Sequence, residues 1–317
     1  WGLASATVGK VTDTGRLVVK EAGDTVCDLP ISLVTDEAPK YDRPTKRPAY
    51  LDELAPVELD DLPLDLGRSI VALAGSPNLC SRRSIFEQFD HMVGLGTVLR
   101  PGADAAVIRV PGSDRGLAIT VDCNSRYCYL NPRLGAQLAV AECARNISCV
   151  GATPAAITDC LNFGNPENPE VMWQFVEAVE GMAEACERLG TPVVSGNVSL
   201  YNETDGRSIY PTPTVGMVGT FASLTSKDQV MTPGFKRQGD RIILLGETYA
   251  EFGGSEVAHL NGLLGDRPPR LDWAREIAVQ RLVRTLIENA AIRSAHDLSE
   301  GGLAMALVEC ALASDSG

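Results

Sequence analysis

Two polar stretches of this sequence carry residue types that could hold a phosphate group and a metal ion. The first follows the apolar run 155–158 and offers Asp159, Asn162 and Asn165, with Gly164 between the two asparagines. Short oxygen-bearing side chains beside glycine can turn sharply and still present acceptors to a ligand. An ordinary Asx-rich turn is the competing interpretation of this stretch alone.

The second stretch, SGNVS at 195–199, follows the apolar run 192–194. Gly196 would let the backbone approach a phosphate closely, and Asn197 can supply a neutral oxygen to a hard cation. Both stretches are predicted to be loops at the ends of adjacent strands, where they would face the same ligand. Together they predict a phosphate and metal site.

One amphipathic helix is predicted to separate the two stretches. It begins near Glu170 and ends at Gly190 and Pro192, residue types that are typical just after a helix. Apolar side chains recur every three or four positions and define the face expected to be buried: Met172, Phe175, Val179, Met182, Cys186 and Leu189.

Composition places the chain among globular proteins and restricts its partners. Of its 317 residues, 44% are apolar and 22% are charged, which suits a packed core. The net charge of -13 argues against nucleic acid as a partner, since that partner usually requires a basic face. No apolar run is long enough for a membrane span, so we expect no membrane partner and a cytoplasmic location.

Metal sites built from cysteine or histidine are not indicated. The nine cysteines form no C-x-x-C pair, and several fall on predicted apolar faces, where free thiols are common in reducing compartments. The three histidines, His91, His259 and His296, are scattered. We therefore expect neither disulfides nor a zinc site.

The first third of the chain is predicted to contribute little to the core. Residues 1–35 read as two or three strands with a hairpin turn at 13–15, and so small a sheet is expected to be the end of a preceding domain. Residues 36–95 carry many Pro, Asp and Glu residues with short helices, as is typical of a linker. Arg82 and Arg83 could meet a phosphate, but a solvated face is the preferred interpretation.

The core is expected in residues 96–224. Strands are predicted at 105–110, at 116–121, which Asp122 closes, and at 213–221. Asn131 and Pro132 are predicted to start a helix. The buried face of this helix is expected to consist of Leu134, Leu138, Ala141 and Ile147. Strands alternating with helices predict an α+β fold, a mixed α/β sandwich with one face of the sheet covered.

Residues 225–317 are predicted to begin a second domain. A strand at 241–245 and a helix at about 272–290 precede HDLSEGG, in which Asp297 and Ser299 are expected to cap a helix through Leu312. GGSE at 253–256 predicts an ordinary capped helix start. Few strands remain to complete this domain, so we expect the chain to be truncated here as well as at its start.

Four segments resemble the large-subunit family of phosphoribosylformylglycinamidine synthase, PurL: GATPAAITDCLNFGNPE, SGNVSLYNET, PTPTVGMVG and HDLSEGGLAMALVE. Within the superfamily of aminoimidazole ribonucleotide synthase-like ATP enzymes, the chain is similar to the second of PurL's two homologous halves. The resemblance implies a PurM-like N-terminal domain at 96–224 and the start of a PurM-like C-terminal domain at 225–317. The sequence contains no Walker or Rossmann glycine motif that would supply a different nucleotide site.

The resemblance also implies roles for four residues. Asp159 of the T-D-x-L-N-F-G run and Gly196 of S-G-N-V-S would contact ATP. Asn197 would bind Mg2+, and Ser199 would contact the substrate. Family members use ATP to phosphorylate the amide oxygen of formylglycinamide ribonucleotide, and ammonia then displaces phosphate to give the amidine. The implied partners are the glutaminase subunit PurQ, which supplies the ammonia, and PurS.

One departure from the family concerns catalysis. The first half of PurL carries an E-T-H-N-H-P-S-type motif, whereas the corresponding run here, VDCNSRYCYLNP, contains Asp122, Asn124 and Arg126 and no histidine. Second halves usually have a D-G-N-G-R-Y-like run at this place, so the difference fits a second half. We therefore expect no catalytic residue in this chain and no turnover by it alone.

Two other interpretations stay open. In the first, the chain holds a structural nucleotide and supports the catalytic half; a substitution of Ser199 without effect on turnover would favour it. In the second, the chain is another superfamily member, related to selenophosphate or thiamine-phosphate kinases. That interpretation is weaker, because such single-unit enzymes are not expected to carry a sheet remnant and a linker like those of residues 1–66.

Overall fold

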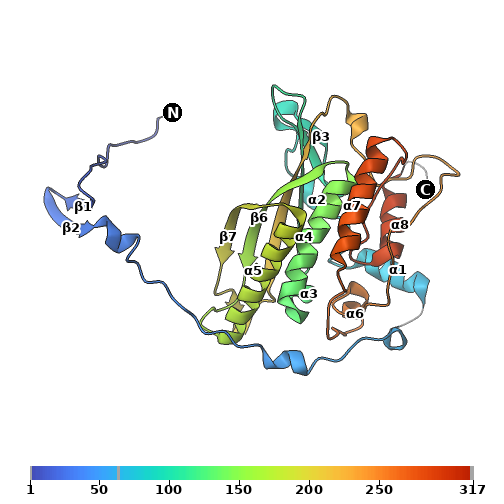
Figure 1. Cartoon of the computed structure of the whole chain (residues 1–317), viewed down its shortest axis with the longest axis horizontal. Coiled ribbons are helices and arrows are strands. Elements are labelled where there is room, and N and C mark those ends of the chain that lie inside the picture. Colours follow the sequence, from blue (N-terminus) through green and yellow to red (C-terminus); the bar gives the residue numbers. More distant parts are fainter. Residues whose placement is uncertain (1, 63–64, 315–317) are drawn as a thin grey trace. The chain divides into compact units, whose positions relative to one another are not determined.

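The computed structural model describes residues 2–62 and 65–314 (Figure 1). The chain divides into two compact units, residues 1–43 and 44–317. The first unit contains one hairpin, formed by β1 (Arg16–Glu21) and β2 (Asp24–Pro30). The prediction of a turn at 13–15 is wrong. The turn is Ala22–Gly23, where φ is 50° and 98°, and a type I′ hairpin turn needs this left-handed backbone at both central positions.

The second unit is built around a six-stranded sheet with the strand order β3-β4-β5-β10-β6-β7. Neighbouring strands are antiparallel except β6 and β7, which are parallel. The strands are β3 (Thr97–Leu99), β4 (Ala106–Arg109), β5 (Gly116–Asp122), β10 (Thr212–Phe221), β6 (Thr153–Asn162) and β7 (Val193–Ser199). A short hairpin, β8 (Glu203–Thr204) and β9 (Arg207–Ser208), follows β7. The three strands predicted for the core are confirmed.

Two long helices, α4 (Pro132–Cys149) and α5 (Pro169–Leu189), cover one face of this sheet (Figure 1). Alternate strand residues face them, and Ile157, Val215 and Met217 are buried in the same apolar core as α4. The helix boundaries follow local signals. Asn131 accepts a hydrogen bond from the Leu134 N–H at 3.0 Å, and α5 ends at Gly190, where φ is 69°. The predicted α+β fold with one covered face is confirmed.

The buried faces of these helices differ in part from the prediction. In α4, Ala141 and Ile147 are buried, but Leu134 and Leu138 are only half-buried. In α5, Val179 is 39% exposed. The buried face of α5 consists of Val171, Gln174, Ala178, Gly181, Met182, Ala185 and Cys186. Small residues determine which face of α5 packs against α4, because a Cβ atom at Gly181 would lie 2.1 Å from the Arg133 carbonyl oxygen of α4.

The C-terminal part contains α6 (Glu256–Leu260), α7 (Trp273–Glu288) and α8 (Gly302–Leu312). The helix predicted at 272–290 is confirmed, as is the ordinary cap of α6 by Ser255. The predicted strand at 241–245 is wrong: within the described ranges this segment pairs with no other strand. Asp297 and Ser299 do not cap α8 either. Its N-cap is Gly301, with a φ of 82°, and the Asp297 carboxylate faces Arg145 instead.

Shorter helices occupy the linker and the connections. The α-helical ones are α1 (Leu66–Gly75), α2 (Arg83–Phe86) and α3 (Ser125–Leu130). The 3-10 helices are Ile31–Val34, Ala49–Asp52, Leu59–Asp61, Val93–Leu95 and Lys227–Gln229. Arg82 donates to backbone carbonyls, and Arg83 is 74% exposed beside Glu87. Both contacts agree with the solvated-face interpretation of these two arginines.

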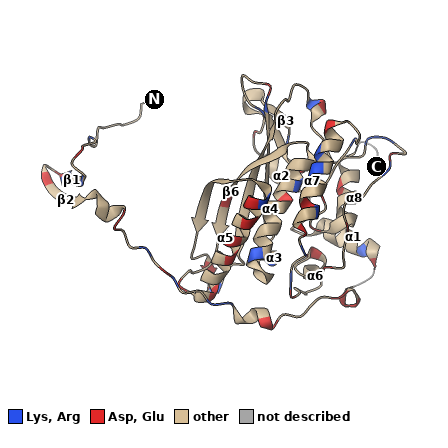
Figure 2. Cartoon of the chain, in the orientation of Figure 1, with Lys and Arg blue, Asp and Glu red and all other residues tan. Residues whose placement is uncertain are grey.

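The surface of the second unit is acidic in part. Figure 2 shows acidic residues distributed along α5, of which Glu180 and Glu187 are exposed. Such a face would repel a phosphate backbone. No helix in the described ranges is both long and apolar enough to cross a membrane.

Candidate functional site

The two predicted ligand-binding stretches lie side by side, because β6 and β7 are paired in parallel. The register places Asp159 opposite Gly196, Cys160 opposite Asn197 and Asn162 opposite Ser199. The prediction that the stretches are adjacent is confirmed. The prediction that they are loops is wrong for Asp159 and Asn162, which belong to β6, and for Gly196, Asn197 and Ser199, which belong to β7; Gly164 and Asn165 follow β6 outside any strand, as predicted. Pairing with neighbouring strands stabilises an extended backbone that the Asn-, Asp- and Gly-rich composition does not favour.

The strand alternation divides the predicted site residues between the two faces of the sheet. Asp159 is in phase with Ile157 and Leu161, which are buried beneath the helices, and its register partner Gly196 shares that face. Asn197 and Ser199 point to the opposite, uncovered face. Since β7 is the edge of the sheet, a ligand that contacts all four residues must lie across this edge.

The Asp159 carboxylate lies directly over Gly196. A Cβ atom at position 196 would be 2.4 Å from the Asp159 Oδ1 atom. Burial raises the pKa of Asp159, while a hydrogen bond from the Asn197 backbone N–H opposes this rise. Gly196 is therefore required for the close approach of the carboxylate to the β7 backbone.

Gly196→Ala is expected to displace Asp159 and lower the free energy of unfolding by about 1–3 kcal/mol, the usual cost of overpacking. Urea unfolding followed by circular dichroism measures this change. Gly75→Ala is the matched control, because Gly75 lies in α1 and a Cβ atom there meets nothing within 4 Å. Equal stability of the two variants would contradict the tight Asp159–Gly196 contact.

Ser199, at the end of β7, is held by Asn202. The Asn202 Nδ2 atom lies 2.8 Å from the Ser199 carbonyl oxygen, 3.0 Å from the Phe163 carbonyl oxygen and 3.2 Å from the Ser199 Oγ atom. The Ser199 Oγ atom lies 3.4 Å from the Asn202 Oδ1 atom. The resemblance assigned no role to Asn202, although it stands in the SLYNET segment.

A second group of ionisable residues lies away from β7, around Arg145. The Arg145 guanidinium is 3.0 Å from Glu276, 3.4 Å from Asp297 and 3.7 Å from Glu142. Asp122 and Glu300 lie close enough to this group to affect its titration. We call Asp122, Glu142, Asp297 and Glu300 the carboxylate cluster.

The carboxylate cluster has more negative charge than its surroundings neutralise. Burial, followed by the charge of Glu300, raises the pKa of Asp122 to about 7. Burial likewise raises the pKa of Asp297 to about 6, although Arg145 opposes the rise. Burial and the charge of Asp122 raise the pKa of Glu142 well above its usual range. The Asp122 Oδ2 atom is buried and has no hydrogen-bond partner.

His296 bridges two parts of the second unit through the carboxylates of Asp104 and Glu309. Its Nδ1 atom is 2.8 Å from Asp104 Oδ1, and its Nε2 atom is 2.9 Å from Glu309 Oε2. Burial alone would lower the pKa of His296, but hydrogen bonds to Asp104 and Glu309 outweigh it and raise the pKa to about 11. The imidazole is therefore protonated and donates from both nitrogens.

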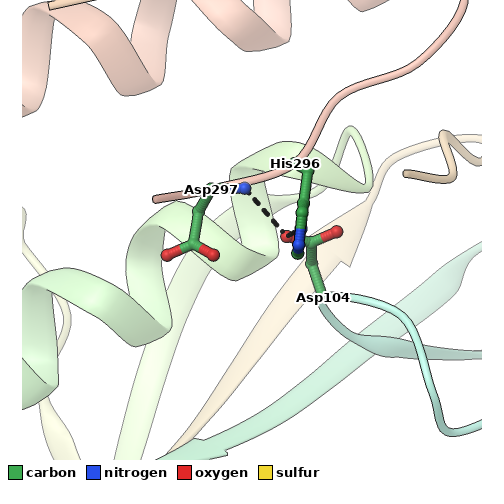
Figure 3. A group of neighbouring side chains, drawn as sticks. All are labelled: Asp104, His296 and Asp297. Atoms are coloured by element: carbon green, nitrogen blue, oxygen red, sulfur yellow. Dashed lines mark hydrogen bonds and ion pairs between the residues drawn. The ribbon is translucent and has the colours of Figure 1, made fainter. Parts of the chain in front are cut away.

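Asp104, His296 and Asp297 carry potential metal-ligand atoms within 4.8 Å of one another (Figure 3). An imidazolium has no free lone pair for a metal ion, however. The Asp297 backbone N–H also donates to Asp104 Oδ1 at 3.1 Å. The arrangement is an ion-pair network that joins the β3–β4 connection to the segment before α8.

The residues at the VDCNSRYCYLNP run have structural contacts. Asn124 caps α3 and donates to Glu300 at 2.7 Å. Arg126 donates to Glu256 at 2.6 Å and to the Gly254 carbonyl oxygen at 2.9 Å. These bonds tie α3 to the C-terminal part. A large cavity in the described part of the chain is lined by Glu142, Arg145 and Asp297, among others, and by none of the four predicted ligand residues.

Comparison with protein families matches both parts of the second unit. The family described as AIR synthase related protein, N-terminal domain, matches residues 102–221, and its C-terminal domain matches residues 237–317. Two similar relatives are named phosphoribosylformylglycinamidine synthase subunit PurL. The Moorella thermoacetica subunit is 52% identical over 100% of this chain, and the Anaeromyxobacter sp. subunit is 51% identical over 98%. The chain spans 43% and 41% of their respective lengths.

Solved structures give the same result. Thermotoga maritima PurL complexed with ATP matches with a TM-score of 0.57 and 26% identity, over 87% of this chain and 38% of that one. The same protein complexed with FGAR matches with a TM-score of 0.56 and 26% identity, over 87% and 37%. A structure of PurLQS from Thermotoga maritima matches with a TM-score of 0.55 and 31% identity, over 71% and 34%.

Proposed function

The chain belongs to the AIR synthase related family, and from this premise we propose that it acts as the second-half portion of a PurL subunit. That subunit would convert formylglycinamide ribonucleotide and ammonia to formylglycinamidine ribonucleotide with ATP, in purine synthesis. The observation that carries the proposal is the parallel pairing of β6 and β7, which sets Asp159 opposite Gly196 and Asn162 opposite Ser199. The solved ATP and FGAR complexes of a similar protein support it.

The proposed roles follow the position of each residue at the β7 edge. Asp159 and Gly196 would contact ATP, Gly196 through the exposed backbone of the edge strand β7. Ser199 would contact the ribonucleotide from the uncovered face. ATP would phosphorylate the amide oxygen, and ammonia would then displace phosphate. We assign no proton-transferring residue to this chain, whose part in the reaction is to bind and orient both substrates.

Magnesium would be held in part by Asn197. This residue is exposed on the edge strand and offers a neutral amide oxygen, a ligand type that Mg2+ accepts. When bound, the ion would neutralise charge on the ATP phosphates. The carboxylate Asp159 lies on the other face of the sheet, so the remaining ligands would come from ATP, water and residues outside this chain.

The proposed partners are the glutaminase subunit PurQ, which supplies ammonia, and PurS. The similarity to a structure titled PurLQS supports this assembly. We place the protein in the cytoplasm together with these subunits.

Asn197→Ala is expected to weaken Mg2+-dependent binding of ATP to this chain by about tenfold or more, since a lost ligand to a charged group costs about 1.5–3 kcal/mol. Calorimetric titration with ATP, with and without Mg2+, measures this effect. Asn289→Ala is the control, because Asn289 is exposed at the end of α7 and its side chain donates to the Thr285 carbonyl oxygen. Equal ATP affinity of both variants and the unaltered chain would show that Asn197 is not part of the magnesium site.

A second candidate function is a structural nucleotide-binding half that supports the catalytic half without turnover. The contacts of Asn124 and Arg126 favour it, because both side chains bind other parts of this chain and are not free to act on a ligand. Turnover of the complete subunit distinguishes the two: Ser199→Ala lowers it under the first proposal and leaves it unchanged under the second.

A further inference from the structure

We propose that Asn202 is a positioning residue that orients the Ser199 hydroxyl, so that Ser199 accepts a hydrogen bond from the ligand. The inference rests on the proposed function, in which Ser199 contacts the ribonucleotide substrate. It adds a residue to that site and states which kind of ligand group Ser199 recognises.

The chain immediately after β7 is bound firmly to the end of β6. Tyr201 has a φ of 60°, a left-handed conformation that is uncommon for a residue other than glycine. Its backbone N–H donates to the Gly164 carbonyl oxygen at 2.9 Å, and the Asn202 N–H donates to the Phe163 carbonyl oxygen at 3.1 Å. The Phe163 N–H in turn donates to the Ser199 carbonyl oxygen at 3.1 Å. This tight turn brings the Asn202 side chain within hydrogen-bond distance of Ser199.

The orientation of the Asn202 amide follows from its neighbours. The two carbonyl oxygens of Ser199 and Phe163, at 2.8 and 3.0 Å, only accept hydrogen bonds. The side-chain atom facing them must therefore be the NH2 group, because Oδ1 would be repelled by both. These two short contacts use both amide hydrogens.

Among the described residues, the Asn202 Oδ1 atom is then the acceptor that remains for the Ser199 hydroxyl proton. The Nδ2 atom, 3.2 Å away, has no further hydrogen to give, whereas Oδ1 at 3.4 Å can accept. The hydroxyl thus donates to Asn202, and its lone pairs remain available. A half-buried serine in this state accepts from a ligand, so it selects a donor such as a ribose hydroxyl or an amide N–H. A phosphate oxygen, which only accepts, would not suit it.

The test compares Ser199→Ala, Asn202→Ala and the double variant in the complete subunit that contains this sequence, with ammonium as the nitrogen source. Each single variant is expected to raise the KM for formylglycinamide ribonucleotide about tenfold, the effect of one lost hydrogen bond, and to leave the KM for ATP unchanged. Because both act through one hydroxyl, the double variant is expected to match the singles rather than multiply their effects.

Asn131→Ala is the matched control, since Asn131 caps α4 through the Leu134 N–H and makes a comparable contribution to stability. If Asn202→Ala lowers the melting temperature as Asn131→Ala does, but leaves the KM for formylglycinamide ribonucleotide unchanged, the inference is overturned. Multiplicative effects in the double variant would overturn it as well. If Asn202→Ala does not fold, Asn202→Ser takes its place in the same comparison. A Ser199→Ala subunit with an unchanged ribonucleotide KM would instead refute the role of Ser199 in the proposed function, and the inference with it.

Discussion

Replacing Arg145 by alanine is expected to destabilise the chain by about 3–5 kcal/mol, the usual cost of leaving buried charges without their partner. The Arg145 side chain is 20% exposed and faces Glu276, Asp297 and Glu142 at 3.0, 3.4 and 3.7 Å. Without the guanidinium, these largely buried carboxylates would repel one another. Urea unfolding at pH 7.5 measures the loss.

Two further variants serve as comparisons for Arg145→Ala. Arg145→Lys keeps the charge but loses the planar fork that reaches several carboxylates, so we expect an intermediate loss. Arg83→Ala is the exposed control: Arg83 is 74% exposed and pairs only with Glu87, and its removal is expected to cost less than about 1 kcal/mol. A loss for Arg145→Ala no greater than for Arg83→Ala would show that the carboxylate cluster is neutralised in another way.

Asp122→Asn is expected to stabilise the chain above neutral pH. The folded-state pKa of Asp122 is about 7, above the value of 3.8 that applies to the unfolded chain. The folded state therefore holds a proton that the unfolded state has released, and stability falls as pH rises from about 4 to about 7. Above that range the penalty is constant. An asparagine has no charge to desolvate, and its NH2 group can donate to Glu142.

The free energy of unfolding of Asp122→Asn is expected to exceed that of the unaltered chain by about 2 kcal/mol at pH 8, roughly half of what the full pKa difference would give. At pH 4 the difference is expected to be close to zero. Melting temperatures of both proteins between pH 4 and 8 measure it. The difference between the two proteins removes the contribution of the His296 network, which loses stability in both as pH rises from about 6.5 towards 11. A stability difference that does not change with pH would contradict the raised pKa of Asp122.

Local signals in the sequence were sufficient for much of the fold. Asn131 with Pro132 starts α4, and Gly190 ends α5, because caps depend on residues next to the helix end. The strands of the sheet core were predicted from their apolar residues. Segment 241–245 has the same apolar pattern but no partner strand in the described ranges, and a single-sequence pattern does not report pairing.

The geometry of the candidate site was not predictable from the sequence, and the ligand-binding roles of its residues stay predictions. Asp159, Gly196, Asn197 and Ser199 were named from motifs, yet their Asx- and Gly-rich surroundings indicated loops. Only the pairing of β6 with β7 shows that they lie on strands and on two faces of the sheet. The carboxylate cluster gave no local signal, because its members come from three separate segments: the end of β5, α4 and the segment before α8. Asp297 resembled a helix cap in sequence, and only the tertiary contact with Arg145 shows its role.

The central position of β10 determines the order in which the sheet can assemble during synthesis. β5 and β6 each have β10 as a neighbour, and the ribosome makes β10 last of the six strands. Until residue 221 emerges, the β5 edge of the β3–β5 sheet and the β6 edge of the β6–α5–β7 unit both lack the strand that will cover them. The nascent chain must therefore keep the β5 edge soluble while residues 123–211 are made, and must keep the two half-sheets apart from the completion of β7 at Ser199 until β10 follows. Closure then joins segments about a hundred residues apart in a single late step, a topology that favours slow folding and gives chaperones a defined interval in which to act.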